Sequence, residues 1–129
     1  MSNYKITSVF FLFFLLGSCE KNSEIITEIV SNDAIEQRSE LIDKGYTEIT
    51  INPIVKESCY FEKWDKTVET PVSGLFEYRD QDNNWIASID FGDGTCDEWA
   101  TKTWSVDIFP DYPEGESEFS VFDIKYKKK

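Results

Sequence analysis

Acidic residues and two glycines are concentrated in one stretch, Ile89-Asp-Phe-Gly-Asp-Gly-Thr-Cys-Asp97. Carboxylates are the hard oxygen ligands that Ca²⁺ prefers. Three lie in this stretch, Asp90, Asp93 and Asp97, and Glu98 follows directly. The same composition suits a tight turn, because glycine adopts a positive φ readily and aspartate hydrogen-bonds to nearby backbone. Neither this stretch nor Asp80–Asn84 completes an EF-hand. We therefore expect a turn between strands, with calcium as the only candidate cofactor.

Four tryptophans form a second candidate site: Trp64, Trp85, Trp99 and Trp104. They are more aromatic surface than a small core must hold, and aromatic rings near loops can form an exposed platform for a glycan. Packing in the core of a small β-domain is the alternative, and the favoured one for any single tryptophan.

The sequence does not favour an enzyme. It contains no histidine, which excludes histidine-based triads and histidine-ligated metal sites. It also contains no nucleophile elbow or phosphate-binding loop. A pair of carboxylates can hydrolyse glycosides, but nothing singles out such a pair among the 25 acidic residues.

The first residues have the pattern of an export signal. Lys5 precedes an apolar run, Val9–Leu16, which is too short to cross a bilayer, since that takes about 20 residues. Leu16-Gly-Ser-Cys19 resembles the lipobox of bacterial lipoproteins. The resemblance implies cleavage before Cys19 and acylation of that residue, with residues 1–18 as signal peptide and 19–23 as a polar tether. An ordinary secretory peptide or a short membrane anchor is the alternative.

Cleavage at this position would leave residues 19–129, which number 111 and carry a formal net charge of −13. That length suits one small domain. The acidic surface argues against a nucleic-acid partner. Acyl chains would hold the protein on a membrane, so the expected location is the cell envelope, with the outer membrane favoured.

Two cysteines remain once Cys19 is assigned to lipid, namely Cys59 and Cys96. An even number in an oxidising compartment predicts one disulfide. Two unpaired buried thiols are the alternative. Zinc is disfavoured, because two cysteines without histidine leave a tetrahedral site short of ligands.

Residues 24–45 have apolar residues closer to helical spacing than to strict alternation, so we expect a helical segment there. Asp33-x-x-Glu36 resembles a capping box, and Gly45 suits the position after a helix. A helix that packs on the domain behind it is favoured over a stalk or a partner-binding helix.

Residues 46–129 change to a period of two, which predicts strands. Pro53 ends or edges the first, Gly74 marks a bulge or close approach in the second, and the last changes phase once between Phe119 and Tyr126. The expected fold is mainly β: a small antiparallel β-sandwich or barrel-like sheet preceded by an N-terminal helical segment.

Two segments together resemble a family of secreted lipoproteins of Bacteroidota: Val72-Ser-Gly-Leu-Phe-Glu-Tyr78 and Ile89–Asp97 with Ala100-Thr101. The family pairs a Ser-Gly strand with an Asp-Phe-Gly-Asp-Gly-x-Cys-Asp turn, and the resemblance implies no activity. Phe91-Gly-Asp-Gly94 also resembles the signature of PKD-type repeats, which supports a β-turn only.

The sequence thus predicts a lipid-anchored cell-envelope protein with a binding or accessory role. A glycan or an envelope protein is the candidate partner beside the membrane. A structural envelope lipoprotein is the nearest alternative, and a carboxylate-based glycan hydrolase is the most distant one.

Overall fold

A computed structural model describes residues 24–128, which form a mainly β protein with one short helix. In chain order the elements are β1 (Glu24–Ser31), α2 (Ile35–Asp43), β2 (Thr47–Phe61), β3 (Lys66–Arg79), β4 (Trp85–Asp93), β5 (Trp99–Trp104), β6 (Glu116–Ser120) and β7 (Phe122–Lys128). The predicted mainly β class is confirmed. The predicted signal peptide 1–18 and tether 19–23, including Cys19, lie outside the described residues.

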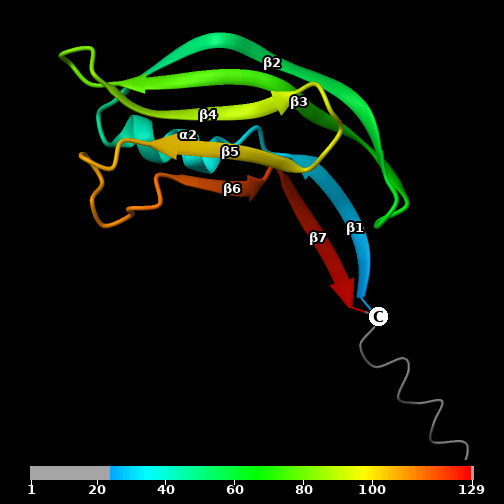
Figure 1. Ribbon diagram of the computed structural model, residues 1–129. Helices are drawn as coiled ribbons and strands as arrows, with labels where there is room; N and C mark the ends of the chain where they lie inside the picture. The colour runs from blue at the N-terminus through cyan, green and yellow to red at the C-terminus, as the bar shows by residue number, and fades with distance from the viewer. Residues whose placement is uncertain (1–23, 129) are drawn as a thin grey trace, which may run out of the picture. The chain divides into compact units, whose positions relative to one another are not determined.

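The strands form two sheets. Strands β2 to β6 make a five-stranded antiparallel sheet in chain order, and β1 pairs with β7 in a two-stranded sheet. The chain divides into two compact units, one being Ile29–Asp123; of the described residues, 24–28 and 124–128 belong to the other. Within the larger unit, Ile29–Asp123, α2 lies against one face of the five-stranded sheet, and β2 and β3 are long and bent (Figure 1).

The core of the larger unit lies on one face of β3 and β4. Alternate residues of these strands are buried, as the period of two predicts, and the register places Phe76 opposite Ile89 and Tyr78 opposite Ala87. The rings of Phe76 and Phe91 pack edge to face with centroids 6.2 Å apart. Burial of each such large side chain contributes about 1.5–3 kcal/mol.

The helical segment predicted over 24–45 is confirmed only for its second half, as α2. Residues 24–31 form the strand β1 instead. Five of its eight residues are β-branched (Ile25, Ile26, Thr27, Ile29 and Val30), and such side chains favour strands over helices because their χ1 is restricted in a helix. Pairing with β7, a partner distant in sequence, then overrides the approximate helical spacing.

The predicted capping box at the start of α2 is wrong, whereas the predicted end is confirmed. The N-cap is Ala34, which offers no side-chain bond, and the Asp33 carboxylate instead accepts a hydrogen bond from Ser31 Oγ at 2.9 Å. The Ala34 N–H donates to Asn32 Oδ1 at 2.9 Å. At the other end Gly45, with φ 98°, follows the C-cap Lys44.

Pro53 and Gly74 mark an irregular part of the sheet edge, as expected. Strand β2 is an edge strand, where proline costs no ladder hydrogen bond, and its register with β3 shifts between Asn52 and Val55. Gly74 has φ 137°, and a Cβ there would lie 2.9 Å from Ile54 Cα. Only glycine permits this close approach of the two strands.

The single last strand expected from the sequence is two strands. The change of phase falls at Val121, the one residue between β6 and β7. Val121 is fully buried, and its N–H donates to Glu98 O at 2.8 Å. The chain thus leaves the five-stranded sheet at this residue and pairs with β1.

Candidate ligand-binding site

The aspartates of the glycine-rich stretch bind backbone. Each accepts a hydrogen bond from the N–H two residues ahead: Gly92 to Asp90 (2.9 Å), Thr95 to Asp93 (3.1 Å) and Trp99 to Asp97 (2.9 Å). Hydrogen bonding with Thr95 lowers the pKa of Asp93. Within residues 24–128, no three or more Asp, Glu, Cys or His side chains are grouped so that they could hold a metal ion. Three successive Asx turns account for this stretch.

Glu98, the carboxylate that directly follows the stretch, is buried. It is 8% exposed, accepts a hydrogen bond from Ser120 Oγ at 3.0 Å and forms an ion pair with Lys63. Its two oxygens therefore tie the start of β5 to the end of β6 and to the turn after β2.

The disulfide predicted between Cys59 and Cys96 is confirmed. Their Cα atoms are 5.7 Å apart, and the bond joins β2 to the segment that follows the glycine turn. Cys59 is buried. A covalent link thus closes the same end of the sheet where Lys63 meets Glu98.

The four tryptophans occupy different places. Trp64 packs with Phe61 and Phe122, with ring centroids 5.4 and 5.9 Å away. Trp85 begins β4 and donates its indole N–H to Ser88 Oγ at 2.8 Å. Trp99 begins β5 and is 47% exposed. Trp104 ends β5, and of the four only Trp104 lines the pocket described next.

That pocket has a volume of about 490 Å³ and lies in the larger unit, between α2, β5, β6 and the loop after β5. Its aromatic lining comes from Trp104, Phe109, Tyr112 and Phe119. Its polar lining comes from Gln37, Glu40, Lys44, Lys102, Glu114 and Ser117. Such a mixture of apolar wall and a few polar groups is typical of small-ligand sites.

Local structure explains why these side chains converge. Gln37, Glu40 and Leu41 of α2, with the C-cap residue Lys44, follow the three- and four-residue spacing of one helix face. On the sheet, Lys102 and Trp104 alternate on β5, and Lys102 is in register with Ser117 of β6. Alternate residues of a strand share a face, so these side chains point to the same side as the helix.

The loop after β5 is held against the strand by hydrogen bonds. Trp104 donates its indole N–H to Tyr112 O at 2.9 Å and its backbone N–H to Gly115 O at 3.0 Å. Phe109 packs edge to face with Tyr46 at 6.4 Å. Tyr112 itself is 58% exposed, so its ring is open to a ligand.

The pocket contains charges of both signs. Lys102 Nζ lies 3.4 Å from Glu40 Oε1, and the Lys102 side chain is only 18% exposed. Lys44 Nζ lies 5.8 Å from the centroid of the Phe109 ring. The site therefore offers donors and acceptors beside aromatic faces.

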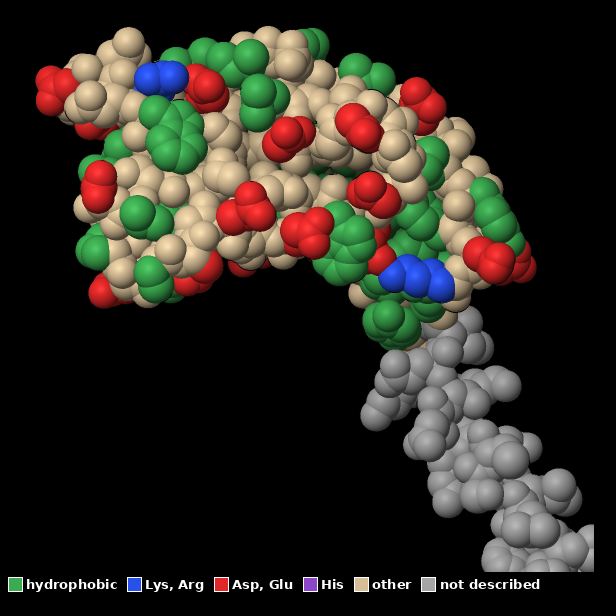
Figure 2. Space-filling model, in the orientation of Figure 1, with side chains coloured by type: hydrophobic (Ala, Val, Ile, Leu, Met, Phe, Trp, Pro, Cys, Tyr) green, Lys and Arg blue, Asp and Glu red, His purple; other side chains and the backbone are tan. Residues whose placement is uncertain are grey.

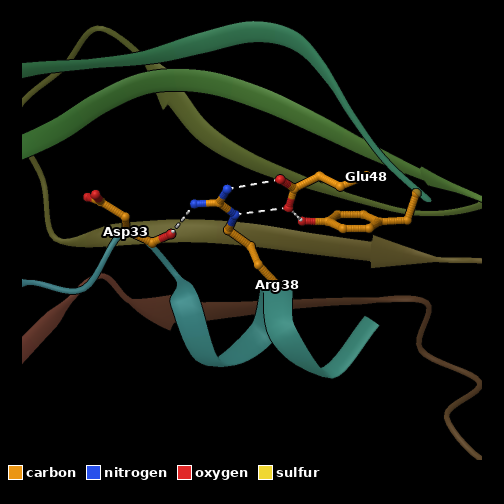
Figure 3. Close-up of polar contacts among 4 residues, drawn as sticks. Asp33, Arg38 and Glu48 are labelled. Atoms are coloured by element: carbon orange, nitrogen blue, oxygen red, sulfur yellow. Dashed lines mark hydrogen bonds and ion pairs between the residues drawn. The ribbon is translucent and has the colours of Figure 1, made fainter. Parts of the chain in front are cut away.

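Helix α2 is held on the sheet by Arg38 (Figure 3). Its guanidinium donates to both carboxylate oxygens of Glu48, at 3.0 and 2.9 Å, and to Asp33 O at 3.3 Å. Its Cζ also lies 4.4 Å from the centroid of the Phe76 ring. Tyr78 Oη donates to the same carboxylate at 2.6 Å. A bidentate arginine pair of this kind fixes geometry as well as charge.

The electrostatics of this network follow from its contacts. The hydrogen bonds from Arg38 lower the pKa of Glu48, and the same pair raises the pKa of Arg38. Burial raises the pKa of Tyr78, so its hydroxyl stays protonated and donates. Sequence reasoning missed Arg38 and Glu48, because an ion pair between residues ten apart in different elements leaves no local pattern.

The sequence matches no protein-family model, and no curated protein or solved structure is significantly similar to it.

Proposed function

We propose that this protein is a lipid-anchored protein of the cell envelope that binds a ligand in the pocket beside α2. The observation that carries the proposal is the pocket itself, which combines four aromatic side chains with ionic and amide groups in about 490 Å³. Aromatic faces bordered by hydrogen-bonding groups suit the apolar faces and hydroxyls of a sugar ring. A glycan is therefore the proposed ligand class.

Exposure within the pocket supports binding over packing. Tyr112 is 58% exposed although its loop is held by backbone hydrogen bonds. Trp64, by contrast, packs against other aromatic rings, which is the structural role expected of a core residue. Among the four candidate tryptophans, Trp104 is the one we assign to the ligand site.

Screening on a glycan array, followed by calorimetric titration with the best-binding oligosaccharide, tests the ligand assignment. Tyr112→Ala should weaken binding roughly two- to tenfold, the effect of losing one stacked aromatic ring. Tyr60→Ala is the matched control, because Tyr60 is also 58% exposed and does not line the pocket. Equal losses in both variants, or no binding to any glycan, would favour the structural envelope role.

The anchoring proposal rests on Leu16-Gly-Ser-Cys19. Cys19→Ala should abolish acylation and move the protein out of the membrane fraction, because the acyl chains supply the membrane affinity. If this variant remains with the membranes, the segment is an uncleaved anchor. None of the helices in residues 24–128 has the length and apolar content needed to cross a membrane.

Two finer proposals accompany this function. The Ser-Gly strand and the glycine turn, now seen as neighbours through the Ser73–Asp93 pair of β3 and β4, support membership of the secreted Bacteroidota lipoproteins. The register shifts that bend β2 and β3 support a barrel-like sheet, because bulges increase local twist and curvature.

A further inference from the structure

The two-stranded sheet brings together parts of the chain that are almost a hundred residues apart. Thr27 Oγ donates to Lys125 O at 3.2 Å, and Lys125 Nζ lies 3.3 Å from Glu28 Oε1. Nearer the other end of the pair, the Asn32 N–H donates to Val121 O at 2.9 Å. The strands are therefore antiparallel, and the last residues of β7 lie beside the first residues of β1.

These last residues carry most of the positive charge of this part of the protein. Four lysines lie between positions 125 and 129: Lys125, Lys127, Lys128 and Lys129. Between positions 20 and 28 there are three glutamates and one lysine, so the two segments together have a net charge of +2. Residues 29–123 contain 22 acidic and 7 basic residues, a net charge of −15.

Figure 2 shows how acidic side chains spread over the face of the protein in view. An anionic membrane surface repels such a chain except where lysines are gathered. The pairing of β1 with β7 determines where that is. It places the end of β7 beside the start of β1, which begins only five residues after Cys19. Five extended residues span at most about 18 Å.

We propose that Lys125 and Lys127 of β7 bind the phosphates of anionic phospholipid headgroups. The inference rests on the proposed anchor at Cys19, which brings β1, and with it β7, to the bilayer surface. Three observations support it. The Lys125 side chain is 67% exposed although it is paired with Glu28. Lys127 is also exposed. Tyr126, between them, is 54% exposed, and tyrosine favours the membrane interface.

The test uses the full-length lipidated protein with vesicles of phosphatidylcholine alone or of phosphatidylcholine mixed with phosphatidylglycerol. Flotation measures retention, and hydrogen exchange measures protection of the Ile124–Lys128 backbone. We expect retention on both vesicles, and exchange several-fold slower on the phosphatidylglycerol vesicles. High salt should remove this difference, because it limits the attraction between lysines and headgroup phosphates to a range of a few ångströms.

A matched pair of charge reversals separates local from overall charge. Lys127→Glu should remove most of the added protection, since one lysine near such a surface is worth about a fivefold change in binding. Lys66→Glu changes the net charge equally and should leave the protection intact. Both lysines are exposed, and neither forms an ion pair with any residue of 26–127, the range whose side chains the structure describes.

The outcomes distinguish the two proposals. Retention on both vesicles with equal exchange overturns the headgroup contact and leaves the anchor standing. Salt-sensitive retention on phosphatidylglycerol vesicles alone supports the contact and overturns the anchor. Retention on neither overturns both, and equal effects of Lys127→Glu and Lys66→Glu overturn the contact, because net charge would then be responsible.

Discussion

At the scale of single residues, the glycine turn at the end of β4 depends on close approach as well as on backbone angle. Gly92 has φ 121°, and a Cβ at this position would lie 3.0 Å from Val72 O. Gly94 has φ 103° but no atom within 4 Å of such a Cβ. The Gly94 N–H donates to the same Val72 oxygen at 2.9 Å. The turn is therefore held against β3 by one carbonyl group.

Alanine substitutions should separate these two effects. Gly94→Ala should lower the free energy of unfolding by about 1 kcal/mol, the order of backbone strain at a positive φ. Gly92→Ala should cost more, because its Cβ also crowds Val72 O. Urea unfolding of both variants measures the difference, and equal losses would show that the contact has no energetic weight.

The Asx turns lead to a prediction about calcium. Since Asp90, Asp93 and Asp97 each accept a backbone hydrogen bond, we expect the same melting temperature in calcium and in chelator. Asp93→Asn keeps one carbonyl oxygen and should cost far less than Gly92→Ala. A rise of several degrees in millimolar calcium that Asp93→Asn reduces would contradict this, because bound metal stabilises the folded state.

At the scale of elements, α2 depends on one polar network. Leu41 is the one buried residue of the helix, and its N-cap Ala34 is buried as well. The carboxylate of Glu48, by contrast, is shared by Arg38 and Tyr78. The helix provides one wall of the pocket, so the network positions the proposed ligand site.

Glu48→Gln should lower the free energy of unfolding by about 1–2 kcal/mol at neutral pH, the order of one charge-assisted hydrogen bond. The folded pKa of Glu48 lies below its ordinary value of 4.5. Its stabilisation is therefore fully present above pH 4.5 and is lost as the pH falls through the folded pKa. Urea unfolding over a pH series should show the gap between wild type and variant closing in acid. A gap that is independent of pH would exclude a role for the charge.

At the scale of the whole molecule, the Cys59–Cys96 bond joins segments 37 residues apart. A cross-link over a loop of this length restricts the unfolded chain and stabilises the fold by up to about 4 kcal/mol in the chain-entropy model. The bond joins β2 to the segment after β4, a link that neither strand pairing nor helix packing provides by itself.

Reduction should accordingly lower the melting temperature by roughly 10 °C or more. Differential scanning calorimetry with and without reductant measures the change. A Cys59→Ala, Cys96→Ala double variant is the control, because its melting temperature should not respond to reductant. In wild-type protein that is denatured but not reduced, Cys59 and Cys96 should not react with thiol reagents. Reaction at either cysteine would contradict the disulfide.

The sequence by itself determined the features that depend on near neighbours. Alternation in β3 and β4 predicted strands and their buried face, because a strand exposes alternate residues to one side. Gly92, Gly94 and their aspartates predicted a turn, since φ preference and Asx hydrogen bonds act within two residues. The disulfide followed because assignment of Cys19 to lipid left only two cysteines, Cys59 and Cys96.

Only the tertiary structure decided the features that need distant partners. Residues 24–31 are a strand because β7 pairs with them, although their spacing resembled a helix. The pocket takes its walls from α2, β5, β6 and a loop, and Arg38 meets Glu48 only once α2 folds back on the sheet. Each contact joins residues whose own neighbours give no sign of it, because packing selects partners by proximity in space, whereas local pattern reports only on adjacent residues.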